Sequence, residues 1–331
     1  MSTPPASGAS TPLAVVVLAA GEGKRMRSSL AKTLHEVAGR PILDHVLRAA
    51  APLGAARTVV LVGVNGKQVE ERFAGRPGVE FVPQDFSTGY GTGHALREAG
   101  RALAGFGGNV MVLNGDGPLL RPATLAALAA SLDGAHGMSL VTCHFSDPTG
   151  LGRIVRGEDG RLSGIVEDKD ATPEQRLITE INPGVYLFDG SVFGHAAQLT
   201  NDNAAGEYYI TDLPGLYLSA GSTVNTVLVG DETELLGVND KAQLALAERV
   251  LRERVRRHWL AEGVTMLDPA TTYIDDTVQF GRDVVLEQGV ILRGATSVGD
   301  GARVGAHSVL TDHEVAAGAR VAPLSVLEGS R

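Results

Sequence analysis

The chain has 331 residues, 44% of them hydrophobic and 20% charged, which is the composition of an ordinary globular protein with room for two domains. Its formal net charge of −9 argues against a nucleic-acid partner held through phosphate contacts. The single cysteine, Cys143, excludes an internal disulfide and favours a reducing compartment. Residues 1–12 are predicted to form a flexible tail, and the sequence shows neither a signal peptide nor a run long enough for a membrane span. We therefore expect a cytoplasmic protein without a membrane partner.

An apolar run, Leu13 to Leu18, predicts a buried parallel strand, and a glycine-rich basic segment follows it directly. Two glycines and four cations lie in this segment: Gly21, Gly23, Lys24, Arg25, Arg27 and Lys32. Glycine lets the backbone approach a ligand closely, and cations beside such a turn suit a polyphosphate. The spacing fits neither a P-loop nor a dinucleotide fingerprint. By itself the segment also allows a simple tight turn with solvated cations.

From residue 13 to about residue 240, short apolar strands alternate with helical stretches, which predicts an α/β fold with a mainly parallel sheet. The predicted strands are Ala14–Leu18, Thr58–Val62, Val79–Val82, Val110–Leu113, Ser139–His144 and Gly184–Phe188. The predicted helices include Ile42–Ala51 and His94–Leu103. The rhythm breaks at residues 147–181, which we interpret as a hairpin-like insertion over one rim of the site.

Polar residues follow several of these strands, at the edge where open α/β sheets bind ligands. Asp116 comes just after the Val110–Leu113 strand, where a carboxylate facing the basic loop would be a Mg²⁺ ligand. The alternative is a turn aspartate that caps a helix opened by Pro118. Gln84 precedes a glycine-rich stretch, residues 88–93, which either reads a base edge or is only a flexible loop. Polar segments at 167–170, 180–184 and 206–212 suit sugar hydroxyls, or are solvated faces.

One long amphipathic helix is predicted between Asp240 and Leu260, with Gly263 ending it. Asn239 lies just before this helix and could serve as its cap. Beyond it, apolar residues recur every six positions and continue after a slip of one residue: Ile274, Phe280, Leu286, Leu292, Val298, Val304, Leu310, Val315, Val321 and Leu327. This hexad repeat predicts a parallel β-helix of about three coils. We interpret it as a capping or oligomerising element.

Taken in order, these segments resemble one family closely, the bacterial bifunctional N-acetylglucosamine-1-phosphate uridylyltransferase/glucosamine-1-phosphate acetyltransferases. The most specific motifs are Leu18-Ala-Ala-Gly-x-Gly-x-Arg-Met26, Gly91-Thr-Gly-His-Ala95, Asp147-Pro-Thr-Gly-x-Gly-Arg153, Glu180-Ile-Asn182 and Asn203-Ala-x-Gly-Glu-Tyr-Tyr-Ile-Thr-Asp212. The resemblance implies a Rossmann-like nucleotidyltransferase domain at residues 13–240 and a connector helix at residues 241–263. It also implies a short left-handed β-helix at residues 264–331.

The resemblance further implies Mg²⁺-dependent synthesis of UDP-N-acetylglucosamine from UTP and N-acetylglucosamine-1-phosphate, and it assigns roles position by position. Asp116 and Asn239 match the pair that binds the metal, and Arg25 and Lys32 match the catalytic cations. The uracil site is matched by Ala20, Gly21, Gln84 and Gly91, with Thr92 beside it. The amino-sugar contacts are matched by Gly152, Glu167 and Asn182.

The sequence departs from the family pattern at four places. Ala31 stands where the family usually has Pro, Asn114 replaces a common Tyr or Ser, and Pro183 replaces a common Thr. Two extra residues lie between Gln84 and Gly91. The chain also ends where the family's β-helix continues, so we expect acetyltransferase activity to be absent.

The coils of relatives pack around a threefold axis, so a homotrimer is expected, with a monomer as the alternative. Three other functions remain open. The first is transfer to another sugar phosphate, such as glucose-1-phosphate, from UTP or dTTP. The second is a non-catalytic regulatory subunit that binds a sugar nucleotide. The third is an acyltransferase based on the β-helix.

Overall fold

The computed structural model describes residues 11–132 and 136–329, so residues 1–10 of the tail predicted at residues 1–12 lie outside the described residues. The chain divides into two compact units. The first takes the chain up to Thr33 and from His45 to Gly237, and the second takes Leu34–Asp44 and the chain from Val238 onward. No pattern in the sequence indicated that residues 34–44 group with the C-terminal residues.

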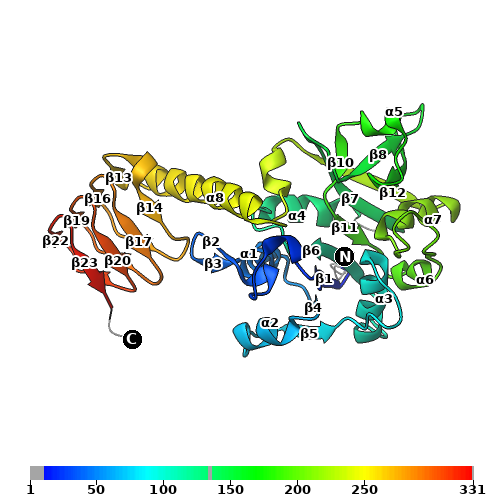
Figure 1. Cartoon of the computed structure of the whole chain (residues 1–331), viewed down its shortest axis with the longest axis horizontal. Helices are drawn as coiled ribbons and strands as arrows, with labels where there is room; N and C mark the ends of the chain where they lie inside the picture. The colour runs from blue at the N-terminus through cyan, green and yellow to red at the C-terminus, as the bar shows by residue number, and fades with distance from the viewer. Residues whose placement is uncertain (1–10, 133–135, 330–331) are drawn as a thin grey trace, which may run out of the picture. The chain divides into compact units, whose positions relative to one another are not determined.

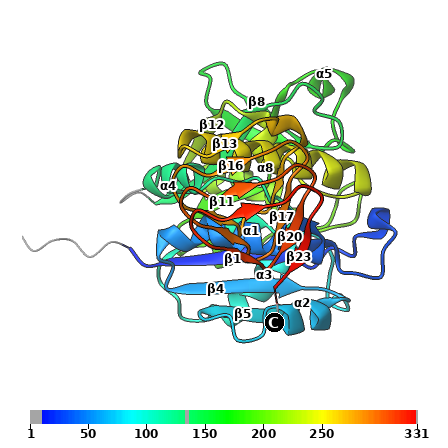
Figure 2. The same cartoon turned by 90° about the vertical axis from the view of Figure 1, so that its left-hand side faces the viewer.

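The first unit is built on a mixed sheet whose parallel half is the predicted one. β1 (Leu13–Ala19) lies between β4 (Arg57–Val62) and β6 (Asn109–Asn114), and β5 (Val79–Pro83) follows β4, all of them parallel. Figure 2 shows β1, β4 and β5 as successive neighbouring arrows. The middle residues of β1 are fully buried, as a strand covered on both faces requires. The predicted α/β fold is confirmed.

The other half of this sheet is mainly antiparallel. β11 (Val185–Phe188) pairs antiparallel with both β6 and β7 (Gly137–His144), and β12 (Thr223–Val229) pairs parallel with β7. The segment predicted as an insertion supplies the remaining strands, which are β8 (Gly152–Arg156), β9 (Leu162–Val166) and β10 (Glu180–Asn182). β8 and β9 form the expected hairpin, and β10 joins it to β7, so the hairpin continues the main sheet.

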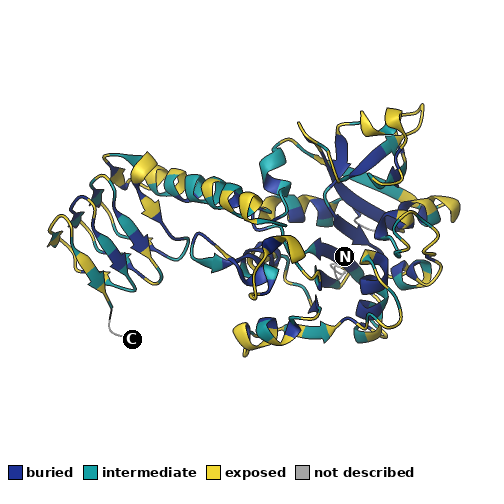
Figure 3. Ribbon diagram, viewed as in Figure 1, coloured by how far each residue is buried: buried dark blue, intermediate teal, exposed yellow. Residues whose placement is uncertain are grey.

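Seven helices accompany these strands in the described chain: α1 (Ile42–Ala50), α2 (Gly66–Arg72), α3 (Thr92–Ala102), α4 (Pro122–Ala130), α5 (Pro173–Arg176), α6 (Val192–Ala196) and α7 (Leu213–Ser219). α3 begins two residues before its predicted start. Its Ala95, Leu96 and Ala99 lie on one face of the helix and are buried in the same core as the sheet residues. Figure 3 shows the strands of this unit largely as buried ribbon.

The second unit contains the predicted long helix and the predicted coils. α8 (Lys241–Ala261) is capped by Asp240, whose Oδ1 accepts a hydrogen bond of 2.8 Å from the backbone N–H of Gln243. Asp240, and not Asn239, is therefore the cap residue. Near the other end of α8, the ring of Trp259 meets Phe280 with centroids 4.8 Å apart and joins the apolar core of the coils.

The coils form a parallel β-helix of three sheets, stacked in Figure 1 from β13 to β23. Its strands are β13 (Thr265–Met266), β14 (Tyr273–Ile274), β15 (Gln279–Phe280), β16 (Val285–Leu286), β17 (Ile291–Arg293), β18 (Ser297–Val298), β19 (Arg303–Val304), β20 (Val309–Thr311), β21 (Glu314–Val315), β22 (Arg320–Val321) and β23 (Val326–Glu328). Paired residues Ile291 and Val309 are eighteen positions apart, whereas Ser297 and Glu314 are seventeen apart. The hexad repeat and its one-residue slip are thus both confirmed.

A short hairpin, β2 (Glu36–Val37) and β3 (Arg40–Pro41), belongs to this unit. The Ala38 backbone N–H donates to Glu248 of α8 at 2.6 Å, and Arg40 Nε donates to Asp276 at 2.6 Å. These bonds explain why residues 34–44 group with the C-terminal residues. Of the helices in the described ranges, none combines the length and apolar character that crossing a bilayer requires.

Candidate active site

A cavity of about 220 Å³ opens in the first unit at the carboxyl ends of β1, β5 and β6. Seven of the twelve site residues predicted from the sequence line it: Ala20, Gly21, Lys32, Gln84, Gly91, Thr92 and Asp116. These residues come from five separate stretches of the chain, and the sheet topology gathers them at one edge. The predicted position of a ligand site at this edge is therefore matched by a real cavity.

The glycine-rich segment after β1 contributes Ala20 and Gly21 to the lining of this cavity, and Lys32 lines it farther along the chain. A side chain at Gly21 would meet nothing within 4 Å, so the protein itself leaves open space there beside the cavity. Gly23 has φ +65°, a left-handed conformation that favours glycine, and a Cβ on it would lie 2.8 Å from Cβ of Lys32. Gly23 therefore allows the loop to pass close to Lys32.

Lys32 and Asp116 form an ion pair in the cavity wall. Nζ of Lys32 lies 2.6 Å from Oδ2 of Asp116, and the two side chains are 12% and 21% exposed. The wall thus offers one cation for a phosphate group and one carboxylate for a hard metal ion. Among the described residues, no group of three or more His, Cys, Asp or Glu side chains could hold a metal. Any ion held at Asp116 would have to take its remaining ligands from groups other than these side chains.

Arg25 is not in the cavity wall. It lies in the short 3₁₀ turn Lys24–Met26, where its side chain is exposed while the neighbouring Met26 is buried. No hydrogen bond or ion pair of the Arg25 side chain occurs within the described part of the chain. Its predicted catalytic role stays a prediction, and it would require the loop to bring the guanidinium toward a bound phosphate.

On the other side of the cavity, the end of the loop and the start of α3 are held in place by contacts with residues 207–210. Gly91 has φ +103°, and a Cβ there would lie 2.5 Å from the backbone oxygen of Tyr208. Thr92 Oγ1 accepts a hydrogen bond of 3.1 Å from the backbone N–H of Ile210. Two motifs that the sequence analysis singled out separately therefore contact each other and shape one wall.

Gln84 is 8% exposed and lies at the end of β5, where its side-chain Nε2 is 3.1 Å from Nδ1 of His94. Phe86 and Tyr90 of the following loop line the cavity, with ring centroids 5.2 Å apart. Thr33, Asn114 and Glu207 also line the cavity without having been predicted as site residues. Tyr90 lies in the glycine-rich stretch that was singled out in the sequence, residues 88–93, whereas no sequence feature had indicated Phe86.

The three predicted sugar-binding residues lie together in the antiparallel half of the sheet. Asn182 of β10 pairs with Gly152 of β8, and a Cβ on Gly152 would lie 3.6 Å from both carboxylate oxygens of Glu167. Glu167 accepts a hydrogen bond of 2.9 Å from the Thr211 hydroxyl. Burial, helped by nearby acidic side chains, raises the pKa of the Glu167 carboxyl. Asn182 Nδ2 donates to the Tyr186 hydroxyl at 2.6 Å.

Asn114 connects the cavity to this sugar cluster. Its side-chain Nδ2 donates a hydrogen bond of 3.2 Å to the backbone oxygen of Pro183, the residue after Asn182. Both Asn114 and Pro183 depart from the family pattern, and the structure puts them in contact. Asn239, in contrast, belongs to the second unit, where its backbone N–H donates to Gln243 Oε1 at 2.8 Å.

Comparison with known proteins gives a consistent picture. The family model described as the MobA-like NTP transferase domain matches residues 15–210. A bifunctional protein GlmU of Corynebacterium aurimucosum is 44% identical over 94% of this chain and 65% of its own length. The GlmU proteins of Thermobifida fusca and Pelobacter propionicus are 46% and 41% identical, over 64% and 69% of their lengths. The chain thus spans about two thirds of the length of the curated relatives that it matches.

Proposed function

The chain belongs to the GlmU family, and on this basis we propose that it makes UDP-N-acetylglucosamine and pyrophosphate from UTP and N-acetylglucosamine-1-phosphate. The observation that carries the proposal is the cavity that gathers seven predicted nucleotide, metal and catalytic residues at one sheet edge. A second supporting observation is the neighbouring cluster of Gly152, Glu167 and Asn182, the three positions expected to contact the sugar.

In the proposed reaction, a phosphate oxygen of the sugar phosphate attacks the α-phosphorus of UTP in line, and pyrophosphate leaves. Such a reaction needs positioning and charge neutralisation more than a general base. Lys32 would neutralise charge on the phosphates, since its ammonium group already lies in the wall of the cavity. The open space at Gly21 would let the phosphates approach the backbone, and Gln84 would face the base.

The donor set at Asp116 fits a divalent cation that arrives with the nucleotide. Asp116 would hold Mg²⁺ through its carboxylate, with phosphate oxygens supplying further ligands. When bound, Mg²⁺ would offset negative charge on the reacting phosphates. Asn239 lies in the second unit, and its pairing with Asp116 stays a prediction, as does the choice of Mg²⁺ over another divalent ion.

The test is an assay of pyrophosphate release by the purified chain with Mg²⁺, across a panel of sugar-1-phosphates and nucleoside triphosphates. We expect the highest kcat/KM with N-acetylglucosamine-1-phosphate and UTP. Faster turnover of glucose-1-phosphate or dTTP would reassign the substrates but keep the reaction. No pyrophosphate release with any pair, in a folded sample that binds UTP, would favour a non-catalytic binding subunit.

We also propose that the β-helix assembles the chain as a homotrimer. Apolar side chains exposed on the second unit support an association surface there, among them Leu267, Leu324 and Val326 at 56%, 75% and 71% exposure. Light scattering at micromolar concentration would test this, and a monomeric mass would reject it. The expected lack of acetyltransferase activity and the cytoplasmic location stay predictions.

A further inference from the structure

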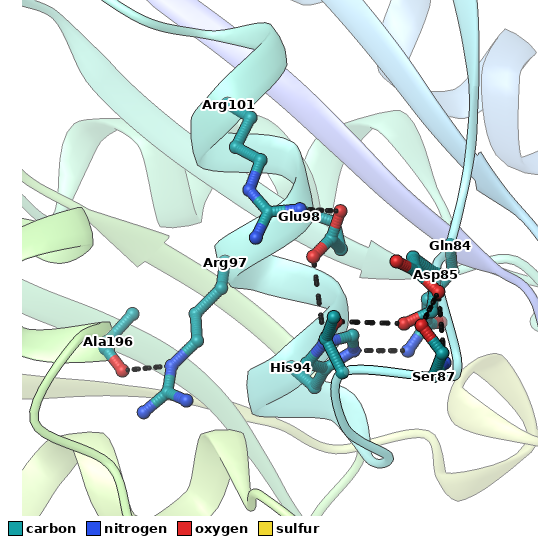
Figure 4. A network of polar contacts seen from close by, with 9 residues as sticks. Gln84, Asp85, Ser87, His94, Arg97, Glu98, Arg101 and Ala196 are labelled. Atoms are coloured by element: carbon teal, nitrogen blue, oxygen red, sulfur yellow. Dashed lines mark hydrogen bonds and ion pairs between the residues drawn. The ribbon is translucent and has the colours of Figure 1, made fainter.

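His94 is a buried histidine that the proposed reaction does not use, yet it touches the residue proposed to face the base. It lies in the first turn of α3 and is only 3% exposed. Its ring lies between Gln84, the loop at residues 85–88 and Glu98 one turn further along the helix. Figure 4 shows the His94 and Gln84 side chains facing each other, with Glu98 on the other side of the ring.

The hydrogen bonds around His94 decide which ring nitrogen carries its proton. The Thr88 hydroxyl donates to the backbone oxygen of Asp85 at 3.1 Å, so its own oxygen is left to accept. His94 Nε2 lies 2.9 Å from that oxygen and must be the donor. Glu98 Oε1 lies 3.6 Å from the same nitrogen, and this buried oxygen has no hydrogen-bond partner among the described residues. A carboxylate oxygen in that position further favours an N–H at Nε2.

A neutral His94 that carries its proton on Nε2 has a lone pair on Nδ1, and this fixes the Gln84 amide. Only an N–H can face a lone pair, so the amide nitrogen of Gln84, and not its oxygen, lies 3.1 Å from Nδ1. The amide oxygen and the second N–H are left for the cavity that Gln84 lines. No hydrogen bond of this oxygen occurs within the described chain.

We propose that His94 is a positioning residue for base selection, because it locks the Gln84 amide with its oxygen available to the nucleobase. This inference rests on the proposed function, which supplies the nucleotide. The Gln84 amide oxygen can accept from the N3–H of uracil or thymine, and the remaining amide N–H can donate to O4 of the same base. Cytosine has the reverse pattern, a lone pair on N3 beside an amino group, so it would match only a reversed amide. A glutamine that could rotate freely would serve both bases.

Burial keeps His94 in the neutral form that the lock requires. Desolvation is the main cause that lowers the pKa of the His94 imidazole. Among the charged groups around it, Glu98 and Asp85 raise this pKa, while Arg97 and Arg101 lower it. Glu98 is itself paired with Arg101 through its other oxygen at 2.8 Å, and the Arg97 guanidinium lies over the neighbouring Tyr208 ring.

The experiment compares binding of UTP and CTP by titration calorimetry in the wild type and in three variants of the full chain. His94→Asn keeps a polar contact to Gln84, but the two side-chain amides can then both rotate by half a turn and still hydrogen-bond to each other. His94→Phe removes the contact, and Thr88→Val removes the acceptor that fixes the ring proton. His195→Phe is the matched control, since its ring packs on Tyr217 with centroids 4.3 Å apart and does not line the cavity.

We expect the wild type to bind UTP more tightly than CTP by roughly 10- to 100-fold, the usual discrimination of a bidentate base contact. In His94→Asn and His94→Phe, CTP binding should become tighter while UTP binding changes little. The ratio of the UTP affinity to the CTP affinity should therefore fall toward one. Thr88→Val should give part of this gain, and His195→Phe should give none. A gain of CTP binding is decisive because structural damage would weaken both nucleotides.

Three outcomes would overturn the inference: a wild type that does not prefer UTP, variants that keep the wild-type ratio, or variants that lose both nucleotides equally. If His94→Phe fails to fold, judged by its thermal transition, His94→Asn and Thr88→Val decide the question. Because the readout is binding, it is separate from the proposed reaction. A wild type that selects UTP through His94 but releases no pyrophosphate would keep this inference and reject the proposed function.

Discussion

Replacing Lys32 by alanine tests the assignment of charge neutralisation to the cavity wall. Among the described lining residues, Lys32 is the only lysine or arginine, whereas Asp116 and Glu207 are both acidic. The variant therefore faces a polyphosphate with two carboxylates and no lysine or arginine side chain in the wall. Removing one preorganised group that stabilises transition-state charge typically costs about 10²–10³ in rate, or roughly 3–4 kcal/mol. We expect kcat to fall by that factor and KM for UTP to rise.

The same substitution should change stability far less. The Lys32 and Asp116 side chains are 12% and 21% exposed, so the unpaired carboxylate keeps some contact with water. A loss of about 1 kcal/mol is expected, which corresponds to a fall in Tm of about 2–4 °C for a domain of this size. Lys24→Ala is the matched control, since Lys24 is in the same loop, 85% exposed and paired with Glu22.

Steady-state kinetics of pyrophosphate release and a thermal melt measure both quantities on one preparation. The expected result is a loss of rate that is large compared with the loss of stability, together with Lys24→Ala within about threefold of the wild type. Turnover of Lys32→Ala within the same threefold range would refute the reasoning. A variant that loses activity only because it unfolds would be recognised by its melt, and Lys32→Met, which keeps most of the side-chain volume, would then replace it.

Three further predictions concern the surroundings of this pair. Gly23→Ala puts a Cβ 2.8 Å from that of Lys32 at φ +65°, so kcat should fall on the order of 10- to 100-fold. Asn114→Ala removes the 3.2 Å bond to Pro183, so KM for the sugar phosphate should rise about fivefold, with KM for UTP unchanged. The pKa of His94 lies below the ordinary 6.5, so the preference for UTP over CTP, measured by titration, should be constant above pH 7. Below that pKa, a protonated Nδ1 can no longer accept from Gln84, and the preference should fall. Unchanged kinetics in the variants, or a preference that rises in acid, would contradict these assignments.

The coils were the most predictable part of this protein, because each hexad places its apolar residue in the same environment. Even the slip after Leu310 could be read from the sequence, since shortening one turn by a residue leaves the stacking of the others intact. The parallel half of the sheet was predicted for a related reason. Buried strands such as β1 are continuous apolar runs, and parallel strands bring their carboxyl ends to one edge.

Strand direction and long-range pairing were not predictable in the same way. An apolar run such as Val185–Phe188 has the same pattern whether it pairs parallel or antiparallel, so the antiparallel half of the sheet appears only in the structure. The grouping of residues 34–44 with α8 depends on hydrogen bonds from Ala38 and Arg40 to residues more than 200 positions away. No local pattern encodes such contacts.

Within the site, the sequence was informative about residues that line the cavity and uninformative about the residues that hold them in place. Gln84 and Asp116 follow strands, and this position was enough to predict that they meet at one edge of the sheet, whereas Ala20 was assigned from the family resemblance; all three line the cavity. His94 stood inside a recognised motif, but its role depends on a hydroxyl six residues earlier and a carboxylate four residues later. Those relations are set by how α3 and the loop before it fold together.

The two departures at Asn114 and Pro183 contact each other in this structure. Proline at position 183 has no backbone N–H, so only its carbonyl can take part in a hydrogen bond at the turn between β10 and β11. Asparagine supplies an N–H donor at the end of β6, and it donates to that carbonyl at 3.2 Å. A tyrosine or serine at position 114 and a threonine at position 183 would offer hydroxyls instead. In this chain the contact therefore links the cavity, which Asn114 lines, to the residue that follows Asn182 of β10.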